Sequence, residues 1–100
     1  MKMYILILDD VPLGHALVAS AHASLACFLR FRDDPGVQAW LEGAFYKVVC
    51  KANAKEFARA KQDPDAVVLT ESALDGREVA VALKPRAEHP RWLRFVKLYR

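Results

Sequence analysis

Apolar residues follow two periods along this chain, and the change of period separates the predicted strands from the predicted helices. Residues 3–8 form an unbroken apolar run, which is typical of a central strand covered on both faces. Residues 45–52 alternate lysines with apolar residues, so this second strand is expected to have one partly solvated face and to lie at a sheet edge. Residues 66–69 and 79–83 are short apolar runs joined by a loop that contains Asp75-Gly76, and they predict an antiparallel hairpin.

The longest helical pattern covers residues 13–31. Spaced at 100° per residue, its larger apolar side chains share one broad arc, which is expected to face the core. The arc contains Leu17, Val18, Ala21, Leu25, Phe28 and Leu29. The opposite arc carries only small residues, namely Ala16, Ser20, Ala23, Ser24 and Cys27. Either the next helix covers this small-residue arc, or a homodimer forms through it or through the edge strand.

Three shorter helices are predicted from their start signals and apolar spacing. Asp34-Pro35 is typical of an N-cap followed by proline at the first helical position, and the helix that it starts ends at Gly43. Asn53 and Glu56 have the spacing of a capping box for a helix that continues to about Lys61. Residues 90–99 predict a terminal helix. The inward side chains are expected to be Val37, Trp40 and Leu41 in the first of these helices, and Trp92, Leu93, Phe95 and Val96 in the last.

The predicted element order is β-α-α-β-α-β-β-α. Helices between strands favour right-handed parallel crossovers, and the hairpin adds an antiparallel strand. The expected fold class is therefore α/β, a three-layer α/β/α domain with a four-stranded mixed sheet. With 100 residues, of which 54% are apolar and 27% charged, the chain can build one hydrophobic core, so residues 1–100 are predicted to form a single domain.

Several classes of protein are disfavoured by the composition. The longest stretch without Lys, Arg, Asp or Glu, residues 11–29, contains two histidines and Pro12 and is too polar for a membrane span. The N-terminal apolar run ends at Asp9, too early for a signal peptide. Cys27 and Cys50 have no metal-binding or disulfide spacing. We therefore expect a cytoplasmic protein with no membrane partner, metal or cofactor.

Charge is unevenly distributed along the sequence. Residues 1–45 carry three basic and five acidic side chains, whereas residues 46–100 carry twelve basic and seven acidic ones. Arg86, Arg91 and Arg94 lie in the basic half, and their candidate role is contact with an RNA backbone. The alternative is that they form the solvated face of the terminal helix.

Polar residues that could carry chemistry follow the first and third predicted strands. Asp9 and Asp10 come after the first strand, and His15 begins the helix that follows, where free backbone N–H groups favour an anion. Glu71 comes after the third strand. Because parallel strands bring their carboxyl ends together, Asp9 and Asp10, His15 and Glu71 are expected to share one cleft. Taken singly, each acid could equally be a solvated carboxylate or a helix cap.

Two other kinds of site are disfavoured by spacing. His15 and His22 are seven residues apart, about 10 Å along a helix axis, which is too far to ligate one metal. Ser20 and Ser24 have no G-x-S-x-G context, which argues against a serine hydrolase.

Short motifs occur in a fixed order along nearly the whole chain. They are Lys2-Met3 at the first strand, Leu13-Gly14-His15 and Ala21-His22-Ala23 in the long helix, Trp40 with Gly43 before Lys47-Val48-Val49-Cys50-Lys51, Lys84-Pro85 after the hairpin, and Val96-Lys97-Leu98. In this order and spacing the chain resembles the type II peptidyl-tRNA hydrolases, the archaeal and eukaryotic form of that enzyme. The resemblance implies a mixed four-stranded sheet between helices, tRNA as a partner, and hydrolysis of the ester between a peptidyl or acyl group and tRNA.

The resemblance also implies a set of site residues, with departures from the family pattern. His15 stands where the family has lysine, Glu71 where it has aspartate, and Ala19 where it has glutamine. The family threonine that opens the last strand aligns with Glu78, and the loop before this strand is shorter here. His15 and Glu71 are the expected catalytic pair, as a general base with a positioned water. The expected substrate-binding residues are Asp10, Gly14, His22, Thr70 and Ser72.

Two functions therefore stay open at the level of sequence. The first is an acyl-tRNA or peptidyl-tRNA esterase that uses His15 and Glu71. The second is a catalytically inactive module of the same fold that binds RNA or a protein partner. Ala19 and the shorter loop favour the second function, whereas the similarity along the whole chain favours the first.

Overall fold

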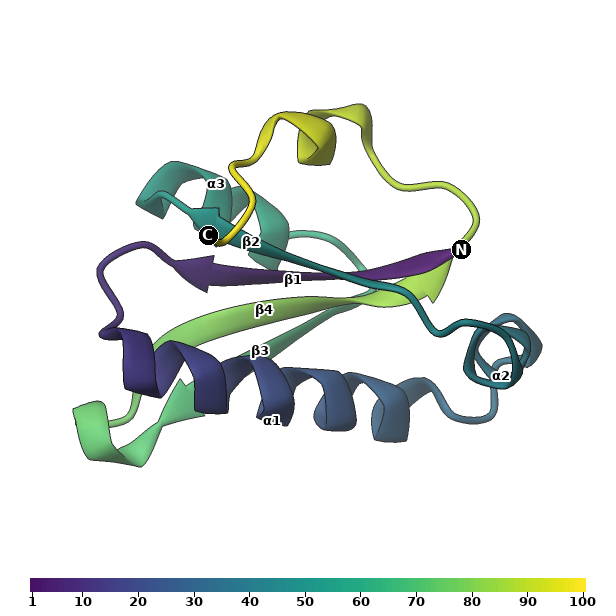
Figure 1. The fold of residues 1–100 in the computed structure, drawn as a ribbon, viewed down its shortest axis with the longest axis horizontal. Coiled ribbons are helices and arrows are strands. Elements are labelled where there is room, and N and C mark those ends of the chain that lie inside the picture. The colour runs from purple at the N-terminus through teal and green to yellow at the C-terminus, as the bar shows by residue number, and fades with distance from the viewer.

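A four-stranded mixed sheet with the strand order β2-β1-β4-β3 lies at the centre of the computed structural model, which describes residues 1–100 (Figure 1). The strands are β1 (Lys2–Leu8), β2 (Lys47–Ala52), β3 (Ala66–Glu71) and β4 (Arg77–Arg86). β1 pairs in parallel with β2 and antiparallel with β4, and β4 pairs antiparallel with β3. The predicted mixed sheet, its terminal hairpin and the edge position of β2 are confirmed.

Helices cover both faces of this sheet (Figure 1). On one face lie α1 (Leu13–Phe31) and α2 (Pro35–Glu42), packed on Met3, Ile5 and Ile7 of β1. On the other face lie α3 (Ala54–Lys61) and a short 3-10 helix, η2 (Arg91–Phe95), packed on Tyr4 and Leu6. Alternate residues of β1 thus belong to two separate apolar cores, which explains the unbroken apolar run in the sequence.

Side-chain caps start two of the helices where the sequence predicts them. Asp34 accepts a hydrogen bond from the backbone N–H of Gly36 at 2.7 Å, and Pro35 is the first residue of α2. Asn53 and Glu56 form both hydrogen bonds of a capping box at the start of α3. These bonds satisfy N–H groups that have no partner within the helix.

The face of α1 that packs on the sheet is the opposite of the predicted one. Its buried residues are Ala16, Ala19, Ala23 and Cys27, whereas Leu17 is 63% exposed and Leu25 is 60% exposed. Large side chains from the sheet, such as Ile5, Ile7 and Val79, already fill the space beneath α1, so only small helix residues allow close packing. The small-residue arc is consequently covered by the chain's own sheet and offers no face for a homodimer.

The predicted C-terminal helix over residues 90–99 is wrong. Only η2 is helical, and the chain then continues in an extended conformation beside β2. The Lys51 N–H donates to the carbonyl of Lys97 at 2.8 Å, and the Tyr99 N–H donates to the carbonyl of Val49 at 2.9 Å. The free edge of β2 supplies these partners, so pairing with it satisfies backbone groups that a helix would have satisfied internally.

Two further side chains that were expected inside lie on the surface. Phe95, at the end of η2, is 80% exposed, while Leu93 and Val96 are buried. Leu41, in the last turn of α2, is 41% exposed at the rim of a groove, while Val37 and Trp40 are buried. No helix of the structure has the length and apolar character that crossing a membrane requires.

Candidate functional site

Two pairs of polar side chains lie at the end of the sheet where β1 and β3 end. β1 and β3 both run antiparallel to β4, so their carboxyl ends lie at the same edge. His15 projects from the first turn of α1, and its Nδ1 lies 4.0 Å from Oε1 of Glu71 at the end of β3. Asp10 pairs with Arg77, which lies directly opposite Glu71 in the register of β3 and β4. We call Asp10, His15, Glu71 and Arg77 the carboxyl-edge cluster.

Glu71 has one engaged and one free carboxylate oxygen. Its Oε2 accepts a hydrogen bond from the backbone N–H of Ala73 at 3.1 Å, which caps the short 3-10 helix η1 (Ser72–Leu74). This bond fixes the side chain and leaves Oε1 directed toward His15. The Glu71 side chain is 17% exposed and that of His15 is 38% exposed, so both groups are accessible to a ligand. A partly shielded carboxylate with a free oxygen can accept a proton from a bound water.

Arg77 is the member of the cluster that sequence reasoning missed. The last strand was predicted to begin at residue 79, which left Arg77 in the loop, but β4 begins at Arg77 itself. Asp75 and Gly76 have positive φ angles of 57° and 73°, and the Gly76 N–H donates to the Glu71 carbonyl at 2.9 Å. The Asp-Gly dipeptide is the signal that could have placed Arg77 opposite Glu71, because it marks a tight reversal between paired strands.

The other expected substrate-binding residues are distributed unevenly around this cluster. Gly14 is exposed next to His15, and Ser72 is exposed as the first residue of η1. Thr70 precedes Glu71 in β3, so strand alternation directs it to the opposite face, where its partner in the register is Glu78. His22 is exposed about 10 Å further along α1. The structure therefore brings Gly14 and Ser72 to the cluster, but not Thr70 and His22.

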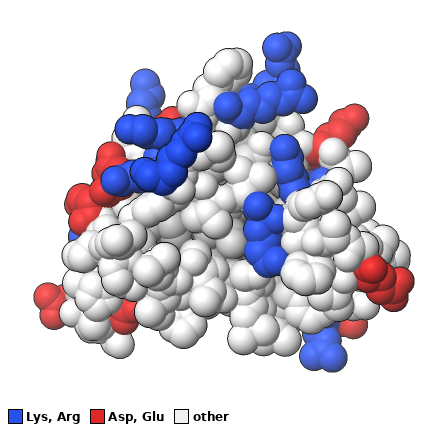
Figure 2. Space-filling view, viewed as in Figure 1, with Lys and Arg blue, Asp and Glu red and all other residues white.

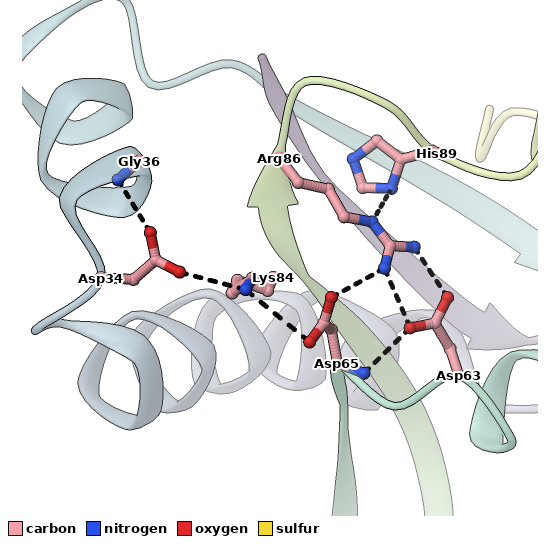
Figure 3. A network of polar contacts seen from close by, with 7 residues as sticks. All are labelled: Asp34, Gly36, Asp63, Asp65, Lys84, Arg86 and His89. Atoms are coloured by element: carbon pink, nitrogen blue, oxygen red, sulfur yellow. Dashed lines mark hydrogen bonds and ion pairs between the residues drawn. The ribbon is translucent and has the colours of Figure 1, made fainter.

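A second polar network lies at the opposite end of the sheet (Figure 3). Arg86, at the end of β4, donates from Nη2 to Asp63 at 2.7 Å and from Nη1 to Asp65 at 2.8 Å. Lys84 joins the same network, with its Nζ 3.0 Å from Asp34 and 3.7 Å from Asp65. The network thus ties the N-cap of α2 to the start of β3 and the end of β4.

The charges of this network shift the pKa values of its members. Burial opposes ionisation of Asp63, but the hydrogen bonds from Arg86 and from the Asp65 N–H, together with the Arg86 charge, outweigh it and hold the pKa of Asp63 below its usual value. The hydrogen bond with Asp63 raises the pKa of Arg86. Four of the five N–H donors of this guanidinium are occupied, by Asp63, Asp65 and His89. Arg86 therefore has a structural role here. Only one of its N–H donors remains for the expected contact with RNA.

His89 completes the network and was not singled out from the sequence. Its Nδ1 accepts a hydrogen bond from Arg86 Nε at 3.1 Å, so the neutral ring donates from Nε2 to the Lys2 carbonyl at 2.8 Å. Burial lowers the pKa of His89, and the neighbouring Arg86 charge acts in the same direction. The ring also packs edge-on against Tyr4 at 4.9 Å between centroids. His89 thus fastens the C-terminal segment to the start of β1 in its uncharged form.

Positive charge is concentrated over α3 and the C-terminal segment (Figure 2). Arg91 and Arg94 are exposed and line a polar pocket of about 430 Å³ together with Lys2 and Glu88. None of the larger pockets is lined by His15 or Glu71. A long polyanion could contact Arg91 and Arg94 from outside without entering a deep cleft.

An apolar groove of about 500 Å³ runs between α1, α2 and β2. Ile5 and Val49 lie at its floor, and Phe28, Trp40 and Leu41 line its walls. The groove contains no acid or histidine, and Lys47 is its only charged residue. It is suited to apolar contacts rather than to acid–base chemistry.

The carboxyl-edge cluster places a carboxylate, an imidazole and a guanidinium at one end of the sheet, and unlike the Arg86 network it leaves a carboxylate oxygen, Glu71 Oε1, without a hydrogen-bond donor. No group of three or more His, Cys, Asp and Glu side chains is arranged to hold a metal ion. The chemistry that the cluster can support is acid–base and electrostatic, carried by Glu71, His15 and Arg77. Comparison of the sequence with protein-family models and with curated proteins finds no match.

Proposed function

We propose that this protein hydrolyses the ester bond between a peptidyl or acyl group and tRNA in the cytoplasm, with His15 and Glu71 as its catalytic pair. The observation that carries the proposal is the 4.0 Å separation between His15 Nδ1 and Glu71 Oε1 at an accessible sheet edge. A water at hydrogen-bond distance from both atoms fits this separation. The resemblance to the type II peptidyl-tRNA hydrolases supplies the substrate class, and the basic C-terminal half of the chain supports an RNA partner.

The proposed reaction needs only these side chains and one water. Glu71 Oε1 takes a proton as the water oxygen attacks the ester carbonyl. Arg77, held by Asp10, stabilises the negative charge that develops on the carbonyl oxygen. The carbon–oxygen bond to the ribose then breaks, and the departing oxygen receives a proton from His15 or from the protonated Glu71. The products are a free carboxylic acid and tRNA with a free ribose hydroxyl.

Turnover of N-acetyl-aminoacyl-tRNA tests this proposal. We expect Glu71→Gln and His15→Ala each to lower kcat by about 10²-fold or more, since each removes a proton-transfer group. The amide oxygen of Gln can still accept the Ala73 N–H bond, so the thermal midpoint of Glu71→Gln is expected to stay close to that of the wild type. His22→Ala is the matched control, because His22 is exposed on the same helix outside the cluster. Full activity in both cluster variants, or no turnover by the wild type, would refute the proposal.

A binding module without hydrolysis is the second candidate, and the burial of Ala19 favours it. This position, where the resembling family has glutamine, carries a methyl group that is 2% exposed and packed against the sheet. No polar side chain from this turn of α1 reaches the cluster. Saturable tRNA binding by a wild-type protein that shows no turnover would identify the module, whereas turnover excludes it.

A further inference from the structure

Exposed apolar side chains form a continuous ridge along α1, and two of its members, Ala21 and Leu25, also line the apolar groove. The ridge consists of every fourth residue, namely Leu13, Leu17, Ala21, Leu25 and Leu29, and its four leucines are between 49% and 63% exposed. We call these five residues the α1 ridge. An exposed helix face of a monomer normally carries charged residues, yet none lies between Val11 and Leu29. Figure 2 shows the surface over α1 as a broad area that is largely without charge.

The α1 ridge is symmetric about its central residue. Counted from Ala21, leucines lie four residues away on each side and again eight residues away on each side. A two-fold axis through Ala21 would therefore place Leu17 against Leu25 of a second copy. Rows of residues spaced by four are those that interdigitate when two helices cross at the commonest packing angle, about −50°. The small side chain of Ala21 at the centre permits close approach of the two helices.

Charge at the two ends of α1 favours the same arrangement. Asp9 is exposed just before the helix, and Arg30 and Arg32 are exposed at its end. An antiparallel pair brings the acidic end of each copy toward the basic end of the other, and it also opposes the two helix dipoles. No charge has to be desolvated along the ridge itself, because it has none.

The area of the patch is of the size that a dimer requires. The exposed parts of the four leucines, together with Val18 and Leu41 beside them, present an apolar surface on the order of 500 Å² per copy. A standard interface buries about 800 Å² per partner, with a polar rim around an apolar centre. Ser20, Ser24 and His22 of α1 can provide such a rim.

We propose that the α1 ridge is the interface of a homodimer in which two copies of α1 cross antiparallel about a two-fold axis at Ala21. This interface is independent of the proposed hydrolysis, since it uses the outer side of the helix. It also differs from an association through the small residues of α1 or through β2, both of which the fold covers.

Sedimentation equilibrium of the full chain tests the interface. We expect twice the chain mass of 11.3 kDa at micromolar concentration. The double variant Leu17→Glu with Leu25→Glu is expected to raise the dimer Kd by at least about 100-fold, because it buries four carboxylates at the contact. Its far-ultraviolet circular dichroism should be unchanged, since both positions are exposed in the monomer and Leu and Glu have similar helix propensities. Phe95→Glu is the matched control, because Phe95 is an exposed apolar residue away from α1.

A disulfide at the proposed axis tests the geometry separately. Two helices about 8–10 Å apart place facing Cα atoms near the about 5.5 Å that a disulfide needs, so oxidised Ala21→Cys is expected to form a covalent dimer. Leu13→Cys is expected to form none, because its two copies lie about 24 Å apart along the helices. The native thiols are buried, and burial raises the pKa of Cys27 to about 12 and that of Cys50 to about 11, so neither should compete.

Each outcome of these experiments bears on the proposal. A dimer that is lost in the glutamate variant, kept in Phe95→Glu and cross-linked at position 21 supports it. A monomer at 200 µM, a dimer insensitive to the glutamate pair, or equal cross-linking at positions 13 and 21 overturns it.

Discussion

Arg86 joins three parts of the chain through one guanidinium group. It contacts Asp63 and Asp65 before β3, and His89 in the segment that follows β4. Its side chain is only 20% exposed, so the two carboxylates would be left close together and poorly solvated without it. A substitution that keeps the size of the side chain but removes its charge therefore isolates the contribution of this ion network to the free energy of unfolding.

We expect Arg86→Gln to lower the free energy of unfolding by about 1–3 kcal/mol at pH 7. The loss should shrink as the pH falls below about 4, because the Asp63 pKa is depressed in the folded state and its contribution disappears when the carboxylate is protonated. Urea unfolding at pH 7 and pH 3.5 measures both effects. The matched control Arg91→Gln, at an exposed position, should change stability by less than about 0.5 kcal/mol. Equal effects from the two substitutions would contradict a structural role for Arg86.

His89 gives a second test of the same network through pH. Burial lowers the pKa of His89 in the folded state below its unfolded value of about 6.5. At pH values between the two pKa values, the unfolded chain therefore binds a proton at this position more readily than the folded chain does. Stability should therefore fall as the pH drops below about 6.5, with a slope smaller than the about 1.4 kcal/mol per pH unit of one full proton. Urea unfolding of the wild type and of His89→Gln between pH 7.5 and 5 should show a shallower slope in the variant. His22→Gln, at an exposed position, should leave the slope unchanged.

The sequence predicts individual site residues only where a general rule fixes their position. Asp10, His15 and Glu71 follow strands that run in the same direction, and the structure does bring them to one edge. Arg86 shows the limit of this approach. Its charge alone was consistent with RNA binding, and its partners come from residues 21 to 23 positions away whose proximity only the folded chain creates.

Helix α1 shows that the period of the apolar residues predicts where a helix lies better than it predicts which face of the helix is buried. The bounds predicted for the helix are confirmed, but the face is inverted. Burial depends on the volume left above the sheet, and a one-dimensional pattern does not contain that volume. Starts of α2 and α3 were predictable because caps are local hydrogen bonds. The C-terminal segment was not, because its extended form depends on the unpaired edge of β2.

A substitution that overpacks the space beneath α1 tests whether this face of the helix is the buried one. Ala23 is fully buried against the sheet, so Ala23→Leu is expected to destabilise the protein by about 1–3 kcal/mol. For a domain of this size, that change lowers Tm by roughly 4–8 °C per kcal/mol. Ala58→Leu on the exposed side of α3 is the matched control and should leave Tm nearly unchanged. A wild-type Tm for Ala23→Leu would show that the small residues of α1 do not pack on the sheet.

At the scale of the whole molecule, the sheet separates regions with different properties. The carboxyl-edge cluster lies at one end of the sheet and the Arg86 network at the other. The outer side of α1 is apolar, while the basic residues of the second half of the chain gather over α3 and the C-terminal segment (Figure 2). A substrate that engages both the cluster and Arg91 and Arg94 must therefore extend along the molecule, as a folded RNA can.

The salt dependence of tRNA binding tests whether this basic surface is used. Lys2, Arg91 and Arg94 line one polar pocket, and if all three contact phosphates, log Ka should fall against log salt with a slope of about −2 to −3. Arg91→Ala with Arg94→Ala should make the slope shallower by about 1.5–2 and weaken binding to all tRNA sequences alike. Arg32→Ala, at the end of α1, is the matched control and should leave the slope unchanged. Fluorescence titration at several salt concentrations measures these slopes. If the wild type does not bind tRNA even at low salt, the basic surface is solvated only, and both the proposed ester substrate and the RNA-binding module lose their support.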